Sequence, residues 1–116
     1  MNQTSNDRIR FLRSLRAVRE YTPEAIDEDV IRDIVDVGRW AGSSSNSQPT
    51  EVVVVRDRKT LELMGSNGAA PAAKCAVAFL VLTAGNPDRR ESEAFDNGRL
   101  VERLLLAAKA HGLGAA

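Results

Sequence analysis

The chain has 116 residues, 16 of them basic and 16 acidic, so its formal net charge at pH 7 is zero. A balanced charge gives no general electrostatic reason to expect nucleic acid or an anionic membrane as a partner. The length predicts one domain, 1–116, and 43% hydrophobic against 28% charged residues is typical of a soluble globular protein.

The cysteine content and the length of the apolar segments indicate in which cellular compartment the protein is expected. Cys75 is the only cysteine and lies in an apolar run, which excludes a disulfide framework and favours a reducing environment. The N-terminus is polar and arginine-rich, without the apolar core of a secretory signal. The longest apolar stretch, 76–82, is too short to span a bilayer. We therefore expect a cytoplasmic protein.

Two helices are predicted in the first 40 residues. Residues 6–17 have apolar side chains recurring on one side and should form the first, which Pro23 interrupts. Asp27 can cap the second, which should end near 40–42. The face that this second helix is expected to bury consists of Val30, Ile31, Ile34, Val35 and Gly38.

Two short strands are predicted next. Val52–Val55 is β-branched and continuously apolar, as in a strand buried on both faces. Asp57 or Thr60 should start a short helix that runs through 64, and residues 75–83 form a second buried strand. This strand–helix–strand order, taken alone, favours parallel strands.

A long helix is predicted over 91–111, with Gly112 as its C-terminal cap. The expected apolar stripe on this helix consists of Ala94, Gly98, Val101, Leu105 and Ala108, widened by Leu104 and Ala107. So broad an apolar surface needs cover from the sheet and from another subunit. Two strands make only a marginal sheet, so we expect the N-terminal part of a larger domain, or one completed by another chain.

Two polar segments are candidate binding sites. Arg16 and Arg19 are three residues apart and suit a phosphate, because a guanidinium donates paired hydrogen bonds and stays charged. The loop 42–48 offers hydroxyls and amides without charge, which suits a planar heterocycle. The alternative for the arginines is a basic first segment that only attracts the acidic second helix. The alternative for the loop is an ordinary connector in which a serine caps the preceding helix. One histidine and no Cys/His cluster indicate no metal site.

Three motifs, in order, carry a resemblance to a known family. They are "RAVREYT" at 16–22, "WAGSSSNSQP" at 40–49 and "FDNGRLVERLLLAAKAHGLG" at 95–114. Together they resemble the nitroreductase family of flavin-dependent oxidoreductases. The resemblance implies an α+β fold, a three-layer α/β/α sandwich with a mostly antiparallel sheet, here apparently incomplete at the C-terminus. It also implies an intertwined homodimer with FMN at the subunit interface.

The resemblance assigns the site residue by residue. The phosphate side of FMN would be held by Arg16, Ala17 and Arg19, with Ala17 standing where the family has a serine. The loop contacts, reaching across from the partner subunit, would be Ser43, Ser44, Asn46 and Gln48. Gly42 stands where the family usually has proline. No side chain is expected to act as a catalytic acid or base.

The activity implied is hydride transfer from NADH or NADPH to the flavin, then to a nitroaromatic, quinone or similar acceptor, by a ping-pong mechanism. Two alternatives stay open: an FMN-binding protein that sequesters the cofactor without turnover, and a dimerising scaffold without cofactor. A family branch that cleaves a carbon–halogen bond or the flavin itself also stays open. Neither nucleic acid nor a membrane is expected as a partner.

Overall fold

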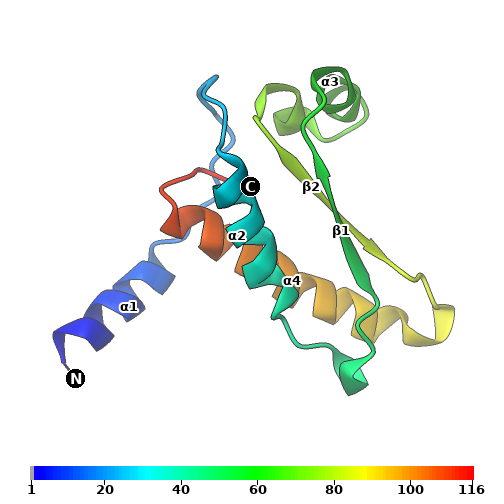
Figure 1. Ribbon diagram of the computed structural model, residues 1–116. Coiled ribbons are helices and arrows are strands. Elements are labelled where there is room, and N and C mark those ends of the chain that lie inside the picture. The colour runs from blue at the N-terminus through cyan, green and yellow to red at the C-terminus, as the bar shows by residue number, and fades with distance from the viewer. Residues whose placement is uncertain (1) are drawn as a thin grey trace.

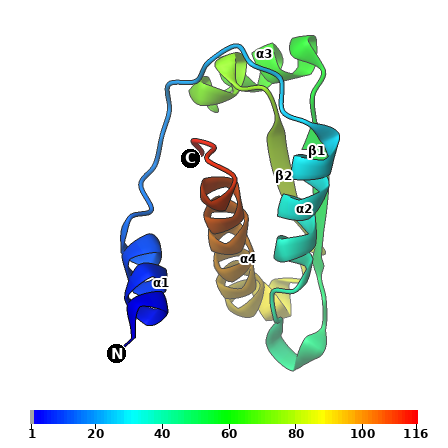
Figure 2. The ribbon, with the colours of Figure 1, turned by 60° about the vertical axis from the view of Figure 1, so that its left-hand side comes forward.

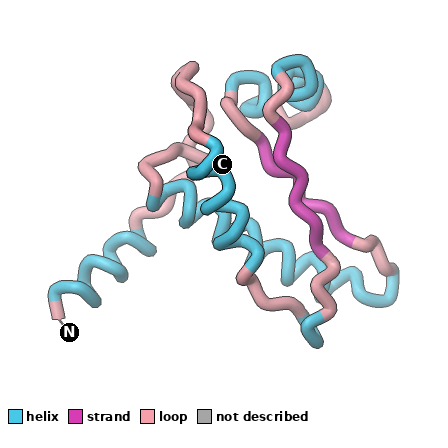
Figure 3. The backbone as a smooth tube through the Cα atoms, in the orientation of Figure 1, coloured by secondary structure: helices cyan, strands magenta, loops and turns pink. Residues whose placement is uncertain are grey.

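The computed structural model describes residues 2–116 as an antiparallel hairpin with helices on one face and at one end (Figures 1 and 3). The longer elements, in chain order, are α1 (Gln3–Arg13), α2 (Glu28–Arg39), β1 (Thr50–Val55), α3 (Arg58–Ser66), β2 (Ala78–Thr83) and α4 (Arg90–Ala110). Three short 3-10 turns, η1 (Ser44–Asn46), η2 (Ala70–Lys74) and η3 (Pro87–Arg89), lie in the connections.

The core lies where α2 crosses α4 over the hairpin. Ile34 of α2 is 1% exposed and packs with Leu100 and Leu104 of α4. Gly38 allows the close approach, because a Cβ at this position would lie 2.6 Å from Leu104 Cδ2. The buried face predicted for α2 is therefore confirmed where it matters most, at Ile31, Ile34 and Gly38.

The two strands pair antiparallel, from Thr50 opposite Thr83 to Val55 opposite Ala78. The parallel arrangement that the element order suggested is wrong, and the antiparallel sheet implied by the resemblance is confirmed. The connection explains this, because α3 and η2 pack on each other at the end of the hairpin (Figure 1). Leu61 of α3 is fully buried there, so the chain turns back beside β1 instead of crossing a face of the sheet.

The expectation that the strands are buried on both faces is wrong. Val52, Phe79 and Val81 pack toward the α2–α4 core, whereas Val53, Leu80 and Leu82 are 42%, 37% and 47% exposed. Side chains alternate between the faces of a strand, and within residues 2–116 helices cover only one of these faces. The described residues thus supply the sheet and one helical layer of the expected sandwich.

Helix α1 stands apart from this body (Figure 2). The first predicted helix exists, but it begins and ends earlier than 6–17. The Asn2 side chain accepts a hydrogen bond from Ser5 N at 2.8 Å, and Ser14 Oγ donates to Phe11 O at 2.7 Å, which closes the helix after Arg13. Every residue of α1 is at least partly exposed, and Leu12 is 53% exposed.

The bounds of α4 were predicted to within one residue, and burial of Leu104, Ala107 and Ala108 confirms the C-terminal half of the expected stripe, but the N-terminal half is wrong. Ala94, Gly98 and Val101 of the expected stripe are exposed, whereas its buried residues are Glu93, Asp96, Leu100, Leu104, Ala107 and Ala108. Two carboxylates turn inward because the flanking loops satisfy them with hydrogen bonds, a possibility that apolar spacing alone does not reveal. The predicted cap is confirmed: Gly112 has φ +74°, and its N–H donates to Lys109 O at 2.9 Å.

An ion pair joins the start of α2 to the end of the hairpin. Arg56, directly after β1, contacts Glu28, and its hydrogen bond lowers the pKa of the Glu28 carboxyl. Within residues 2–116 no helix is long and apolar enough to cross a membrane. The cytoplasmic location stays a prediction.

Candidate functional site

The serine-rich loop that precedes β1 has an unusual backbone. Ser45, Asn46 and Gln48 have φ values of 54°, 51° and 49°, in the left-handed region that residues other than glycine seldom adopt. Each such residue costs about 1–2 kcal/mol relative to an ordinary conformation. The loop keeps this shape only if surrounding contacts hold it.

Those contacts come from the first turns of α4 and the residue before it. Asp96 is 4% exposed and accepts hydrogen bonds from Ser44 N at 2.8 Å and Ser44 Oγ at 3.3 Å. Arg89 Nη2 donates to Ser44 O at 3.2 Å. Asn97 Oδ1 accepts from the hydroxyl of Thr50 at 3.0 Å, where the loop enters β1. The loop is thus fixed near α4 at Ser44 and again where it enters β1.

The remaining hydrogen-bonding capacity of the loop is uncharged. Ser43 Oγ accepts from Gln48 N at 2.9 Å, which leaves its proton available to donate. The side-chain amides of Asn46 and Gln48 are exposed, and each makes no hydrogen bond within residues 2–116. Such a set of neutral donors and acceptors fits the carbonyl and nitrogen edge of a planar heterocycle.

Gly42 makes room for a guanidinium beside this loop. A Cβ at position 42 would lie 3.0 Å from Arg99 Nη2, and Arg99 Nη1 is 4.0 Å from Asp96 Oδ1. The glycine that replaces the family's proline therefore lies under the Arg99 side chain, close to the carboxylate that holds the loop.

The arginine segment has a different local structure from the one predicted. Residues 15–20 are not helical, so Arg16 and Ala17, predicted to end the first helix, lie instead with Arg19 in an extended connection. Arg16 Nη1 donates to the carbonyls of Arg13 and Leu15, at 2.9 and 2.7 Å. Arg16, Ala17 and Arg19 are all exposed.

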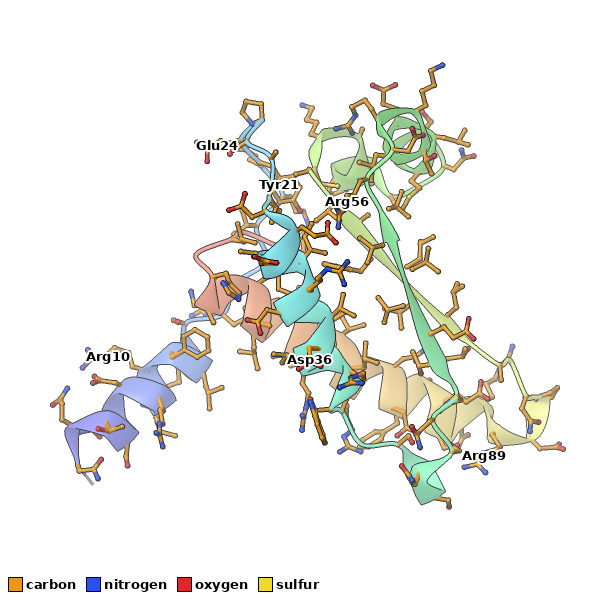
Figure 4. All side chains as sticks on the ribbon, viewed as in Figure 1. Arg10, Tyr21, Glu24, Asp36, Arg56 and Arg89 are labelled. Carbon is orange, nitrogen blue, oxygen red and sulfur yellow. The ribbon has the colours of Figure 1, made fainter. Side chains whose placement is uncertain are left out.

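Arg19 lines a hollow of about 900 Å³ between this segment, the hairpin and the C-terminal end of α4. Tyr21 lines the same hollow, and Figure 4 shows it beyond the N-terminal end of α2. Burial raises the pKa of the Tyr21 phenol, the nearby Cys75 raises it further, and Arg19 opposes the shift. Arg19 is therefore the cation that faces this hollow alongside Tyr21.

The two halves of the predicted site lie at opposite ends of α4. Figure 4 shows Tyr21 at one end of the molecule and Arg89, which bonds Ser44, at the other. Asp96 is separated by about 20 Å of helix from the end of α4 at Ala110. Past that end, Ala115 O accepts from Val18 N at 2.9 Å, beside Arg19. One chain does not bring the serine loop and the arginines together.

Sequence reasoning missed Asp96, Arg89 and Arg99 as residues of the site. A signal was present for Asp96, which is an acidic residue near the start of the third motif, on a helix whose other buried residues include Glu93 and four apolar side chains. Within residues 2–116 no group of three or more histidine, cysteine or acidic side chains is placed to hold a metal ion.

Solved structures define the class of fold. A structure from Parabacteroides distasonis, provisionally named an NADH dehydrogenase/NAD(P)H nitroreductase, is 28% identical and superposes with a TM-score of 0.80 over 98% of this chain and 66% of its own. A provisionally named nitroreductase from Desulfovibrio desulfuricans, solved in complex with FMN, is also 28% identical, with a TM-score of 0.79 and the same coverage. The fold is thus the α+β fold of nitroreductases.

The family follows from the sequence comparison. The model of the Nitroreductase family matches residues 12–80, which is more than half of the chain, and the chain belongs to that family. A relative from Archaeoglobus fulgidus, provisionally named an NADH dehydrogenase/NAD(P)H nitroreductase, is 26% identical over 111 residues, covering 92% of this chain and 64% of the relative. The chain spans about two thirds of the length of these relatives.

The strain in the loop can be measured with two matched substitutions. Ser45 is left-handed, whereas Ser47 has φ −70° and ψ −23°. Because a serine-to-glycine change loosens the unfolded chain equally at both positions, Ser45→Gly should be more stable to urea than Ser47→Gly by about 1–2 kcal/mol. Equal stabilities would mean that the loop does not hold this conformation in solution.

Proposed function

We propose that this protein is an FMN-dependent oxidoreductase that takes hydride from NADH or NADPH. The observation that carries the proposal is the match, over 98% of this chain, to a relative solved in complex with FMN. The names of other relatives, which include NAD(P)H nitroreductase, support the choice of electron donor. The proposed acceptor is a nitroaromatic, a quinone or a similar small molecule, reduced in the second half of a ping-pong cycle.

The residues of both segments fit FMN chemically. Arg16 and Arg19 supply guanidinium groups for the phosphate. Ala17, which lies between them in the sequence, is exposed, and its side chain has no hydrogen-bond donor. The loop residues Asn46 and Gln48 supply neutral amides for the ring system. When bound, FMN supplies the redox chemistry, accepting hydride from the nicotinamide and passing electrons to the acceptor.

The protein's own contribution is binding and orientation. The single histidine, His111, contacts Asp33 Oδ2 at 2.6 Å and lies at the end of α4 remote from the serine loop. No side chain is therefore assigned as a catalytic acid or base. The donors of the loop are held in place before a ligand arrives, which lowers the entropy lost on binding.

The same geometry supports a homodimer in which residues 1–116 of each chain form one domain. A site containing both segments needs the arginines of one copy and the serine loop of another, because α4 separates them within one chain. Exposed aromatic groups support this arrangement: Trp40 is 71% exposed and Phe95 66%, with the Arg99 guanidinium 5.9 Å from the Phe95 ring centroid. Aromatic and arginine side chains are enriched in protein interfaces.

Reduction by a nicotinamide donor tests the activity. Purified protein reconstituted with FMN should be yellow and should lose its visible flavin absorbance when NADH or NADPH is added without oxygen. Admission of a quinone should restore the colour. A protein that binds FMN but stays yellow would be a flavin-sequestering protein, and one that stays colourless after reconstitution would contradict flavin binding altogether.

The phosphate contact is tested by Arg19→Ala. Loss of a charge-assisted hydrogen bond should weaken FMN binding by about 1.5–3 kcal/mol, which is about 10- to 150-fold in Kd. Arg8→Ala is the matched control, because it removes the same charge from the exposed face of α1. Titration of apo-protein with FMN measures both, and an unchanged Kd for Arg19→Ala would remove Arg19 from the site.

A further inference from the structure

Asp96 is a buried carboxylate that no expectation from the sequence assigned to the site. It is 4% exposed, and both of its oxygens face Ser44, one toward the backbone N–H and the other toward the hydroxyl. The Arg99 guanidinium is 4.0 Å away and half-exposed, so it compensates the buried charge only weakly. Ser44 therefore provides the main hydrogen bonds that allow this carboxylate to be buried.

Ser44 is the first residue of the turn that carries the left-handed Ser45 and Asn46. The N–H and the hydroxyl of Ser44 donate hydrogen bonds to Asp96, and its carbonyl accepts one from Arg89, so every polar group of Ser44 has a hydrogen-bond partner. Asn46, two residues later, is exposed and has φ 51°, so the direction of its side chain depends on the turn keeping this strained backbone. Asp96 thus fixes the residue from which the strained turn starts.

From this geometry we infer that Asp96 is a positioning residue, which holds the Ser43–Gln48 loop in the conformation that contacts the cofactor. The inference rests on the proposed function, because it assigns a role toward FMN to a residue that need not touch FMN. It makes loop order, and through it cofactor affinity, depend on one carboxylate of α4.

The same helix offers a matched control. Glu93, one turn earlier, is 6% exposed and accepts hydrogen bonds from the backbone N–H groups of Gly85 and Asn86, at 3.2 and 3.4 Å. It holds the turn after β2 in the way that Asp96 holds the loop before β1. Glu93→Gln and Asp96→Asn remove the same charge from the same helix, but only the second touches the serine loop.

The test is FMN titration of the two variants well below their melting temperatures. Asp96→Asn should weaken FMN binding about 10-fold, since it removes the acceptor of one charge-assisted hydrogen bond, whereas Glu93→Gln should change Kd less than about twofold. The double variant Asp96→Asn/Asn46→Ala should lose less FMN binding free energy than the sum of the losses of the two single variants, because both residues act through one loop. A merely structural role would weaken both variants alike and leave the effects additive.

Hydrogen exchange gives a second readout that needs no variant and no FMN. In the wild-type protein the Ser44 amide should exchange more slowly than the Ser45 amide, and exchange at equal rates would overturn the inference even if Asp96→Asn does not fold. If Asp96→Asn binds FMN with wild-type affinity, this inference is overturned but the proposed function is not. A wild-type protein that binds no FMN would overturn the proposed function and this inference with it.

Discussion

The length of α4 is the constraint on which the rest of the structure depends. Its 21 residues extend about 30 Å. Its first turns hold the serine loop through Asp96, and the chain beyond its last turn holds the arginine segment through the bond between Val18 and Ala115. The helix also provides the central surface on which α2 and the hairpin pack. Two groups of proposed cofactor contacts are therefore kept apart by a rigid element, and a site that uses both must be shared between two copies.

Helix α4 achieves this with an arrangement of side chains that departs from simple amphipathicity. At its N-terminal end the buried residues are Glu93 and Asp96, and Phe95 between them points outward. Carboxylates tolerate burial here because backbone N–H groups of two loops donate to them, which ties the start of β1 and the end of β2, at one end of the hairpin, to one helix. Phe95 and Trp40 are exposed and available to the proposed partner subunit. The loop contacts and the proposed contact through Phe95 thus use different faces of α4.

Much of the fold was predictable because its signals are local. The spacing of Ile31, Ile34 and Gly38 gave the buried face of α2, and Gly112 marked the end of α4. The errors arose where tertiary contacts decide. The strands pair antiparallel because α3 packs on η2 at the end of the hairpin. Asp96 of α4 faces inward because it accepts a hydrogen bond from Ser44, which is 52 residues away in the sequence. The motifs identified the candidate site residues, but nothing in local spacing could place Arg19 and Ser44 at opposite ends of the molecule.

Mixing two defective chains tests the central claim most directly. Arg19→Ala lacks the phosphate contact and Asn46→Ala lacks a loop contact, so each homodimer should bind FMN weakly at both sites. If each site takes its arginines from one chain and its loop from the other, a mixed dimer combines both defects in one site and leaves the second intact. Titration of the mixed dimer should then recover wild-type affinity at one site per two chains. Uniformly weak binding at every site of the mixed dimer would contradict the account, because it would mean that both contacts come from the same chain.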